Sequence, residues 1–305
     1  MNARREKRDL HGWLVLDKEV GETSTAAVAA LKRLFRAKKV GHAGTLDPLA
    51  SGVLPIAFGE ATKTVSFVMD GRKAYRFTVR WGVETETDDC EGRALAESAA
   101  RPLPEAIRAL LPRFTGTIEQ TPPRFSALKI DGERAYNLAR DGEDVALAPR
   151  RIDVHRLTLV ATPDADRAVF ETECGKGTYV RALARDIGRA LGSLGHVCEL
   201  RRTQVGSFDE GNAVRFAALA RLAEEGGDPA AALLPVESAL AAVPALQVSR
   251  ADADRLALGQ SVLLRGRDAP LLEGIVSVST QGFLVALAEV ERGALKPRRI
   301  FNLTR

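Results

Sequence analysis

The stretch that decides how this chain folds reads Gly41-His-Ala-Gly-Thr-Leu-Asp-Pro-Leu-Ala-Ser-Gly52, followed by Val53-Leu-Pro-Ile-Ala-Phe58. The first part is polar and is broken by glycine and proline, so it predicts a structured loop. The second part is apolar and predicts a segment of the core. Asp47 has an unusual setting, because Pro48 restricts its backbone to extended conformations and the neighbouring glycines allow another segment to approach closely.

On both sides of this stretch, strand and helix patterns follow one another without regular alternation. Residues 74–82 alternate between apolar and polar side chains, which is typical of a half-buried strand. The order of elements predicts an α+β fold with a mixed or antiparallel sheet. The other segments that carry this prediction are a strand at 12–17, a helix that begins near Thr23 or Ser24, strands at 151–161 and 168–174, and a helix capped by Thr178 that reaches Leu191.

A change of pattern near residue 245 predicts two domains. The Ala-rich region 216–243 ends in glycines and prolines, and four short strand-like runs with one short helix follow it. We therefore expect a large domain over 1–244 and a small β-rich domain over 245–305.

Composition favours a water-soluble globular protein. Hydrophobic residues make up 45% of the 305 residues and charged residues 28%, which is enough to bury a large core. The net charge is +4, and residues 1–40 hold ten Lys or Arg against five Asp or Glu. This excess permits a polyanionic partner without requiring one. The sequence contains no apolar run near 18 residues and no apolar leader, so we expect no membrane span and a cytoplasmic location.

Cysteine and glycine patterns give no sign of a metal or a nucleotide cofactor. Cys90, Cys174 and Cys198 are far apart and odd in number, which favours a reducing compartment over a disulfide framework. His196 and Cys198 lack partners at metal-ligand spacing. The Gly175-Lys-Gly177 segment lacks the third glycine of a dinucleotide-binding motif, and no phosphate-binding loop occurs.

Three side chains could carry chemistry, and each also has an ordinary structural interpretation. Asp47 could belong to a simple Asp-Pro turn, and Tyr75 could be a core aromatic of its strand. Arg181 could be a solvated helix residue, but beside a buried aspartate it would keep that carboxylate ionised. Nothing in their spacing shows that the three side chains meet.

Seven sequence blocks follow one another along the chain: Gly12–Lys18, Gly41–Ile56, Lys73–Arg76, Gly82–Asp89, Pro122–Lys129, Cys174–Arg181 and His196–Arg202. In this order they resemble the TruB family of bacterial tRNA pseudouridine-55 synthases. One departure is Phe125, where tyrosine is commoner in the family, so the hydroxyl is lost there while the ring is kept. The C-terminal region of about 60 residues resembles the small β-barrel PUA domain only weakly.

The resemblance implies a function and gives each matched residue a role. The enzyme would flip a uridine out of a tRNA loop and rejoin its base through C5, which needs neither metal nor cofactor. Asp47 would be the catalytic carboxylate, and Arg181 would pair with it through a two-bond fork. Tyr75 would stack on the flipped base and is a candidate for taking the C2′ proton. The remaining substrate-binding residues implied are His42, which would hold the everted loop, Tyr179 and Leu200, which would line the pocket, and Lys18 near the active site.

The expected partner is the T-arm stem-loop of tRNA, bound by a protein that we expect to be monomeric. The N-terminal basic cluster and the arginines of the 178–191 helix would contact its phosphates, because RNA is recognised largely through shape and backbone. Two other functions stay open. The chain could be a non-catalytic RNA-binding protein or tRNA chaperone, or a pseudouridine synthase that acts on another RNA.

Overall fold

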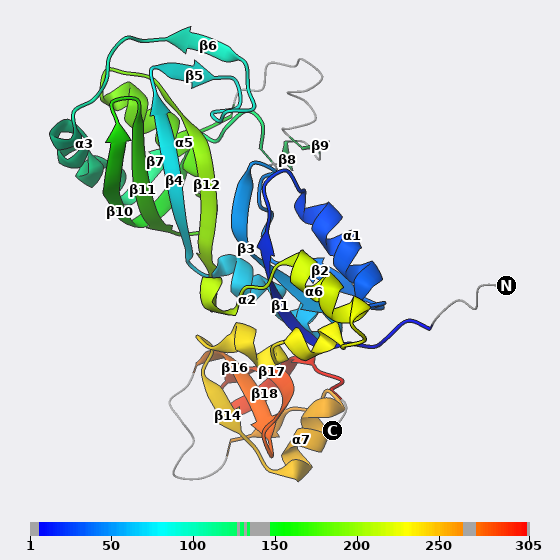
Figure 1. Ribbon diagram of the computed structural model, residues 1–305. Helices are drawn as coiled ribbons and strands as arrows, with labels where there is room; N and C mark the ends of the chain where they lie inside the picture. Colours follow the sequence, from blue (N-terminus) through cyan, green and yellow to red (C-terminus); the bar gives the residue numbers. More distant parts are fainter. Residues whose placement is uncertain (1–5, 127–128, 131–132, 135–146, 265–272, 304–305) are drawn as a thin grey trace.

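A computed structural model of the chain describes residues 6–126, 129–130, 133–134, 147–264 and 273–303. Within these residues, the main body contains a nine-stranded mixed sheet, and the C-terminal part contains a separate five-stranded sheet (Figure 1). The strands of the large sheet are β1 (Gly12–Lys18), β2 (Val40–His42), β3 (Ala50–Phe58), β4 (Lys73–Trp81), β7 (Gly116–Gln120), β10 (Arg150–Asp164), β11 (Arg167–Cys174), β12 (Gly195–Val205) and β13 (Phe208–Asp209).

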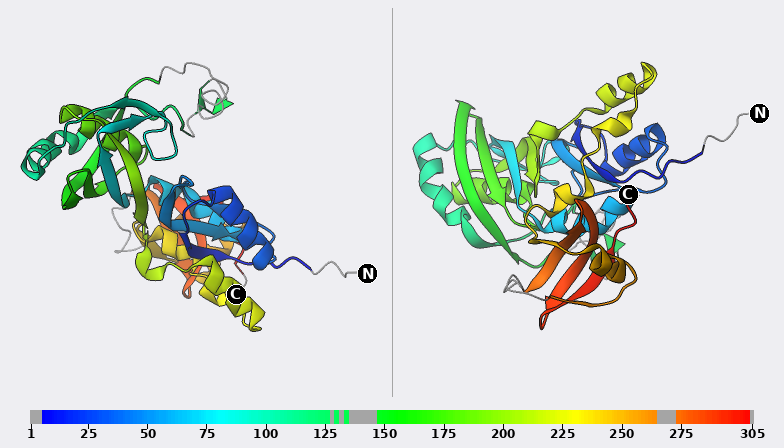
Figure 2. Two further views of the ribbon diagram at one scale, coloured as in Figure 1. Left: turned by 45° about the horizontal axis from the view of Figure 1, so that its top comes forward. Right: turned by 90° about the horizontal axis from the view of Figure 1, so that it is seen from below.

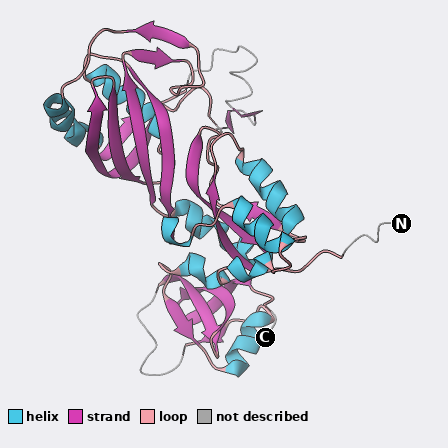
Figure 3. Cartoon of the chain, viewed as in Figure 1, coloured by secondary structure: helices cyan, strands magenta, loops and turns pink. Residues whose placement is uncertain are grey.

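Six α-helices among the described residues pack against the two sheets, and short 3-10 turns connect them (Figure 3). None of these helices is both long and apolar enough to cross a membrane. The helices are α1 (Ser24–Leu34), α2 (Val65–Asp70), α3 (Pro104–Leu110), α5 (Val180–Ala190), α6 (Phe216–Glu224) and α7 (Arg250–Ala257), and the 3-10 turns are η1 (Gly59–Thr64), η2 (Leu111–Phe114), η3 (Glu210–Asn212), η4 (Pro229–Ala232) and η5 (Val236–Leu240). Two small hairpins complete the main body: β5 (Val83–Thr85) with β6 (Ala94–Glu97), and β8 (Lys129–Ile130) with β9 (Glu133–Arg134).

The large sheet consists of two parts that meet where β3 pairs with β12. The strand order is β1-β3-β12-β4-β11-β10-β7, and its pairings are antiparallel except at β3 and β12. There the parallel register joins Leu200 to Ala50 and Arg202 to Gly52. Figure 1 shows the two parts on either side of this junction, so the loop that precedes β3 lies where they meet. The mixed-sheet α+β fold predicted from the sequence is confirmed.

The structure confirms the burial pattern predicted for β4 and corrects the bounds predicted for two other segments. Along β4 the side chains of Tyr75 and Phe77 are buried while that of Arg76 is exposed, as the alternation predicts. The polar loop is shorter than expected, because residues 40–42 already form β2 and β3 begins at Ala50. Tyr179, and not Thr178, is the N-cap of α5.

The C-terminal part is a sheet of strand order β14-β16-β17-β18-β15 that packs against α7. Figure 2 shows it beside the main body. The two parts share an apolar cluster in which Leu284, Leu287 and Phe301 are buried together with Trp13 and Phe208. The C-terminal part therefore packs against the main body through a shared apolar core. Its strands are β14 (Ala245–Gln247), β15 (Val262–Leu263), β16 (Gly274–Thr280), β17 (Phe283–Glu291) and β18 (Ala294–Ile300).

Polar contacts reinforce this interface. Lys63 of η1 donates from Nζ to the carbonyl oxygen of Ile300 at 2.8 Å. The backbone N–H of Asn302 donates to Oε2 of Glu60 at 2.7 Å. A chain ended at Pro244 would lose these bonds and expose the shared apolar cluster, so we expect it to lose stability as well as any RNA contacts.

The shared cluster predicts that Leu287→Ala destabilises the whole chain. The substitution leaves a cavity between the two parts and should lower the free energy of unfolding by about 2–4 kcal/mol. Phe283→Ala on the same strand is the control, because Phe283 is 46% exposed and its loss should change stability by no more than about 0.5 kcal/mol. Urea unfolding followed by tryptophan fluorescence measures both. Equal stability of the two variants would show that the parts do not share a core.

Candidate active site

Asp47 lies in the loop 43–49 between β2 and β3, and backbone and side-chain bonds fix this loop on both sides of it. Ser24, at the start of α1, donates from Oγ to the carbonyl oxygen of Leu46 at 3.0 Å and accepts from the N–H of Leu46 at 2.9 Å. The carbonyl oxygen of Asp47 accepts from the N–H of Ala50 at 3.0 Å. The Asp47 side chain is 39% exposed.

Lys18 holds the same loop from the other side. Its side chain is buried, and Nζ donates to the carbonyl oxygens of Glu19 at 2.7 Å and Glu22 at 2.8 Å. It also donates to the carbonyl oxygen of Pro48 at 3.4 Å, which accepts from the N–H of Gly21 as well. Burial lowers the pKa of the Lys18 ammonium, which carboxylates nearby partly offset. Lys18 therefore supports the Asp47 loop from within the protein and does not line the pocket.

Arg202 on β12 is a second buried cation that binds this loop. Its Nε donates to the carbonyl oxygen of Val53 at 2.8 Å. Its Nη1 and Nη2 donate to the carbonyl oxygens of Thr45 at 3.3 Å and Gly44 at 3.1 Å. The pairing of β12 with β3 brings the backbones so close that a Cβ on Gly52 would lie 2.2 Å from the carbonyl oxygen of Arg202. Only glycine fits there, which explains one glycine of the loop block.

Arg181, in the first turn of α5, connects the Asp47 loop to two other segments. Its Nε lies 3.0 Å from Oδ2 of Asp47. Its Nη1 donates to the carbonyl oxygen of Thr87 at 2.8 Å and to Oδ2 of Asp89 at 3.2 Å. Its Nη2 donates to the carbonyl oxygen of Phe125 at 3.0 Å. The expected pair with Asp47 is present through Nε, while the hydrogen bonds of Nη1 and Nη2 go to Thr87, Asp89 and Phe125.

The next arginines of α5 are also paired with carboxylates. Arg185 is buried, with Nη1 2.8 Å from Oδ2 of Asp88 and Nε 2.8 Å from Oδ1 of Asp186. Arg189 pairs with Glu84. Burial raises the pKa of Asp88 to about 6, although the Arg185 guanidinium opposes this shift. The expectation that the arginines of this helix contact phosphates is wrong for Arg181 and Arg185, because both are buried. It stays a prediction for Arg189, whose side chain is exposed.

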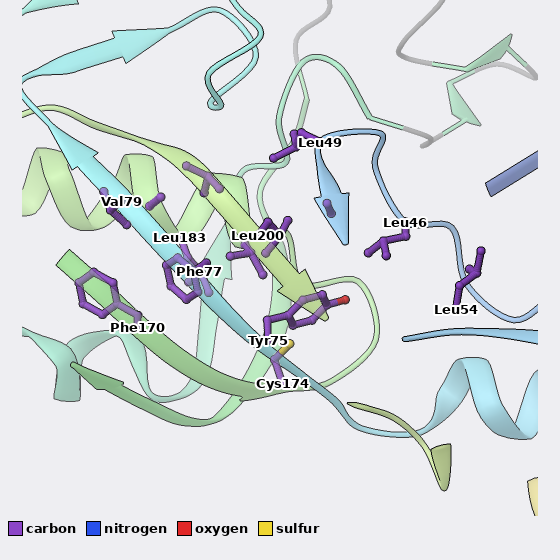
Figure 4. Packing of buried hydrophobic residues seen from close by; sticks show 14 of the residues in the cluster. Leu46, Leu49, Leu54, Tyr75, Phe77, Val79, Phe170, Cys174, Leu183 and Leu200 are labelled. Carbon is purple, nitrogen blue, oxygen red and sulfur yellow. The ribbon is translucent and has the colours of Figure 1, made fainter. Parts of the chain in front are cut away.

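A small pocket of about 100 Å³ brings five of the candidate residues together. Figure 4 shows Tyr75 and Leu200 side by side, with the hydroxyl end of Tyr75 directed toward the segment that carries Leu46. The Asp47 carboxylate is the acid that lines this pocket. The lining residues are Thr45, Leu46, Asp47, Tyr75, Thr178, Tyr179, Val180, Arg181 and Leu200.

His42 lies on β2, outside the lining of the pocket. Its side chain is half-buried, and Nδ1 has no hydrogen-bond partner among the described residues. Burial, and then the positive charge of Arg202, lower the pKa of His42. The imidazole is therefore neutral near pH 7 and keeps an unused ring nitrogen.

Two residues of the site were not identified from the sequence alone. Asp89 is buried against Arg181, and Arg202 is buried behind the Asp47 loop. Both lie inside sequence blocks that resemble the family, and this is the one signal that could have found them. In the described part of the chain, no three His, Cys, Asp or Glu side chains are grouped to hold a metal ion.

Two family models match this chain, over residues 32–180 and 181–241. Residues 32–180 match the model of the TruB family pseudouridylate synthase N-terminal domain, and residues 181–241 match the tRNA pseudouridylate synthase B C-terminal domain. A tRNA pseudouridine synthase B from Bradyrhizobium diazoefficiens is 66% identical over 99% of this chain and 89% of its own. One from Rhodopseudomonas palustris is also 66% identical, over 99% and 83%. One from Agrobacterium fabrum is 54% identical, over 97% and 96%.

Solved structures with the same fold include the crystal structure of a Cbf5-Nop10-Gar1 complex. One of its chains is 26% identical, with a TM-score of 0.75 over 95% of this chain and 84% of that one. An archaeal box H/ACA sRNP Nop10-Cbf5 complex contains a chain that is also 26% identical, with a TM-score of 0.73 over 96% and 86%. Sequence identity over nearly the full length, together with the two family models, shows that this chain belongs to the TruB family of pseudouridylate synthases.

Proposed function

We propose that this chain converts a uridine of tRNA to pseudouridine and that Asp47 is the catalytic carboxylate. The observation that carries the proposal is the pair between Asp47 and Arg181 inside the small pocket. Asp47 is partly exposed while Arg181 is buried. A substrate can therefore contact the carboxylate, but the guanidinium is shielded from it. The family and the names of the similar relatives support the same reaction.

The proposed reaction is an isomerisation that needs no outside reactant. The N1–C1′ bond of the uridine breaks, the uracil turns within the pocket, and C5 forms the new bond to C1′ before it loses its proton. An ionised carboxylate can take part in two ways: attack on C1′ gives a covalent intermediate, and removal of the C2′ proton gives a glycal. Asp47 is the carboxylate for either route.

Tyr75 suits contact with the base better than proton removal. Burial raises the pKa of its phenol to about 12, and Arg202 opposes this shift. The phenol is therefore neutral near pH 7 and can donate a hydrogen bond, but a neutral phenol is a weak base. We assign Tyr75, with Leu200 and Tyr179, to contacts with the flipped uracil.

The proposed substrate element is the T-arm stem-loop, with the target uridine at position 55. The target base must leave its stack before it can enter a pocket, at a cost of a few kcal/mol. The His42 side chain is partly exposed, and by resemblance we assign it to holding the opened loop. The basic side chains of Lys32, Arg33 and Lys39 are exposed and suit contact with phosphates. By resemblance, we propose that residues 245–305 form a PUA-like domain that adds RNA contacts.

Asp47→Asn should abolish pseudouridine formation, because the amide can neither attack C1′ nor take a proton. We expect turnover to fall by at least about a thousandfold, with tRNA affinity little changed. Tritium release from C5-labelled uridine measures turnover, filter binding measures affinity, and mapping of the product tests position 55. Asp70→Asn is the matched control, because Asp70 pairs with Lys176 at the surface, outside the pocket. Full activity of the purified Asp47→Asn variant would refute the assignment of Asp47.

Arg181→Lys should lower turnover by about a hundredfold or more while the protein stays folded. One ammonium cannot reach the two carboxylates and two carbonyls that the guanidinium joins. Turnover at saturating tRNA and thermal unfolding of the same sample give the two readouts. Arg189→Lys is the control, since Arg189 lies on the same helix at the surface. Turnover equal to wild type in Arg181→Lys would show that the guanidinium geometry does not matter.

Tyr75→Phe should change how stability depends on alkaline pH. The folded chain keeps the Tyr75 proton up to a pKa of about 12, whereas an unfolded chain loses it near pH 10. The stability that the neutral phenol confers is complete below pH 10 and falls as the pH rises toward 12. Between pH 10 and 11, wild type should lose about 1 kcal/mol more than the variant. Urea unfolding at pH 8 to 11 tests this, and parallel curves would argue against it.

A further inference from the structure

A second cavity of about 580 Å³ adjoins the catalytic pocket and is lined mostly by apolar side chains. Leu200 belongs to the walls of both cavities. Two of the chain's three cysteines, Cys90 and Cys198, also line the larger cavity. The third, Cys174, is fully buried in the core. The proposed reaction gives these two cysteines no part.

Backbone pairing places Cys90 and Cys198 side by side, although 108 positions separate them. Asp89 and Val197 form a parallel bridge, and the N–H of Val197 donates to the carbonyl oxygen of Asp88 at 3.1 Å. Cys90 and Cys198 are the next residues along these two segments. Neighbouring strands lie about 4.7–4.9 Å apart, which is within the Cα separation of about 4.4–6.8 Å that a disulfide spans.

Side-chain contacts agree with this placement. The Cys90 thiol is 3.9 Å from the carbonyl oxygen of Cys198. Cys198 lies at a register shift of β12 against β4, where Val197 pairs with Val79 and Glu199 pairs with Thr78. Cys198 is thus the extra residue of a bulge, and its thiol contacts the carbonyl oxygen of Thr78 at 3.5 Å. A bulged residue is free of the ladder pairing that would fix it, so a rotation of each side chain can bring the two sulfurs together.

We propose that Cys90 and Cys198 are a modification site: they exchange with a small-molecule disulfide to form a reversible intramolecular disulfide. The Cys90 thiolate attacks the small disulfide, giving a mixed disulfide and releasing one small thiol. The Cys198 thiolate then attacks the Cys90 sulfur, and the second small thiol leaves. The protein thiols lose two electrons and two protons, and the reagent gains both as two thiols.

Exposure decides which cysteine reacts first. Cys90 is exposed, and Cys198 is partly exposed beside it. Burial raises the pKa of the Cys174 thiol to about 11, so this thiol has little thiolate and no access to reagent. Burial and the carboxylate of Asp89 also raise the pKa of Cys90, which makes the exchange slow rather than impossible. Cys174 therefore serves as an internal control.

The disulfide would act on the site through its neighbours in the chain, and this step rests on the proposed function. Asp89, which pairs with Arg181, directly precedes Cys90, and Leu200 of the pocket lies two residues after Cys198. A covalent link would turn both thiols away from the carbonyl oxygens that they now contact and would tie the two segments to each other. Small displacements of groups in a preorganised site lower the reaction rate, so we expect oxidation to reduce turnover on the order of tenfold.

The test exposes the full chain to excess oxidised glutathione. Intact mass should show the loss of two hydrogens without an added glutathione, and digestion should give one linked peptide that contains Cys90 and Cys198. Turnover on tRNA should fall and should return after treatment with dithiothreitol. Cys90→Ser and Cys198→Ser are the matched controls, and both should keep their turnover in the oxidant.

Three results would overturn the proposal. A glutathione adduct on Cys90 without any linked peptide would exclude the intramolecular bond. A linked peptide with unchanged turnover would show that the disulfide forms but does not affect the site. Equal inhibition of wild type and both serine variants would place the effect elsewhere. If untreated wild type shows no turnover at all, the proposed function fails, whereas the linked peptide still tests the disulfide by itself.

Discussion

The arrangement of the active site depends on one buried cation, the guanidinium of Arg181. An unpaired charge in a protein interior costs several kcal/mol, so a fold that buries one must supply partners. Here the partners come from the Asp47 loop, from Thr87 and Asp89, and from the backbone of Phe125. Three segments far apart in the sequence are therefore held together by the need to neutralise and hydrogen-bond one side chain. The same requirement that stabilises this part of the fold places Asp47 in the pocket.

Two further buried cations restrain the loop that carries Asp47. Lys18 donates to the carbonyl oxygen of the residue that follows Asp47, and Arg202 donates to the two carbonyl oxygens of Gly44 and Thr45. A loop with its carbonyl groups turned toward these fixed donors has few alternative conformations. Catalytic groups work best when the protein orders them before the substrate arrives. In the proposed reaction, Lys18 and Arg202 thus order the loop that carries Asp47, although neither lines the pocket.

The parts of this structure that could be predicted are those in which a local pattern determines the outcome. Alternation of side chains predicted β4, and the spacing of apolar residues predicted α1 and α5. The burial of Arg181 and Arg185 was missed, because arginines spaced by four on one side of a helix are typical of a solvated face. Their partner carboxylates Asp89 and Asp88 lie more than 90 positions away, and no local pattern contains that pairing. The core shared with the C-terminal part was missed for a related reason. A run of prolines and glycines predicts where one sheet ends and the next begins. It does not indicate whether side chains of the two parts pack into one core, as they do here.

Five candidate residues of the matched sequence blocks meet in the pocket, but the blocks did not indicate that Asp47 and Asp89 share Arg181. In the proposed reaction, Asp47 loses its negative charge by either route, as an ester with C1′ or by taking a proton from C2′. If Asp47 were the sole partner of Arg181, the reaction would leave a buried, unpaired guanidinium, which is strongly unfavourable. Asp89, with its side chain only 3% exposed, stays paired with Arg181 and does not line the pocket. Two carboxylates on one guanidinium therefore separate two tasks: Asp89 keeps the buried cation neutralised, and Asp47 is free to react.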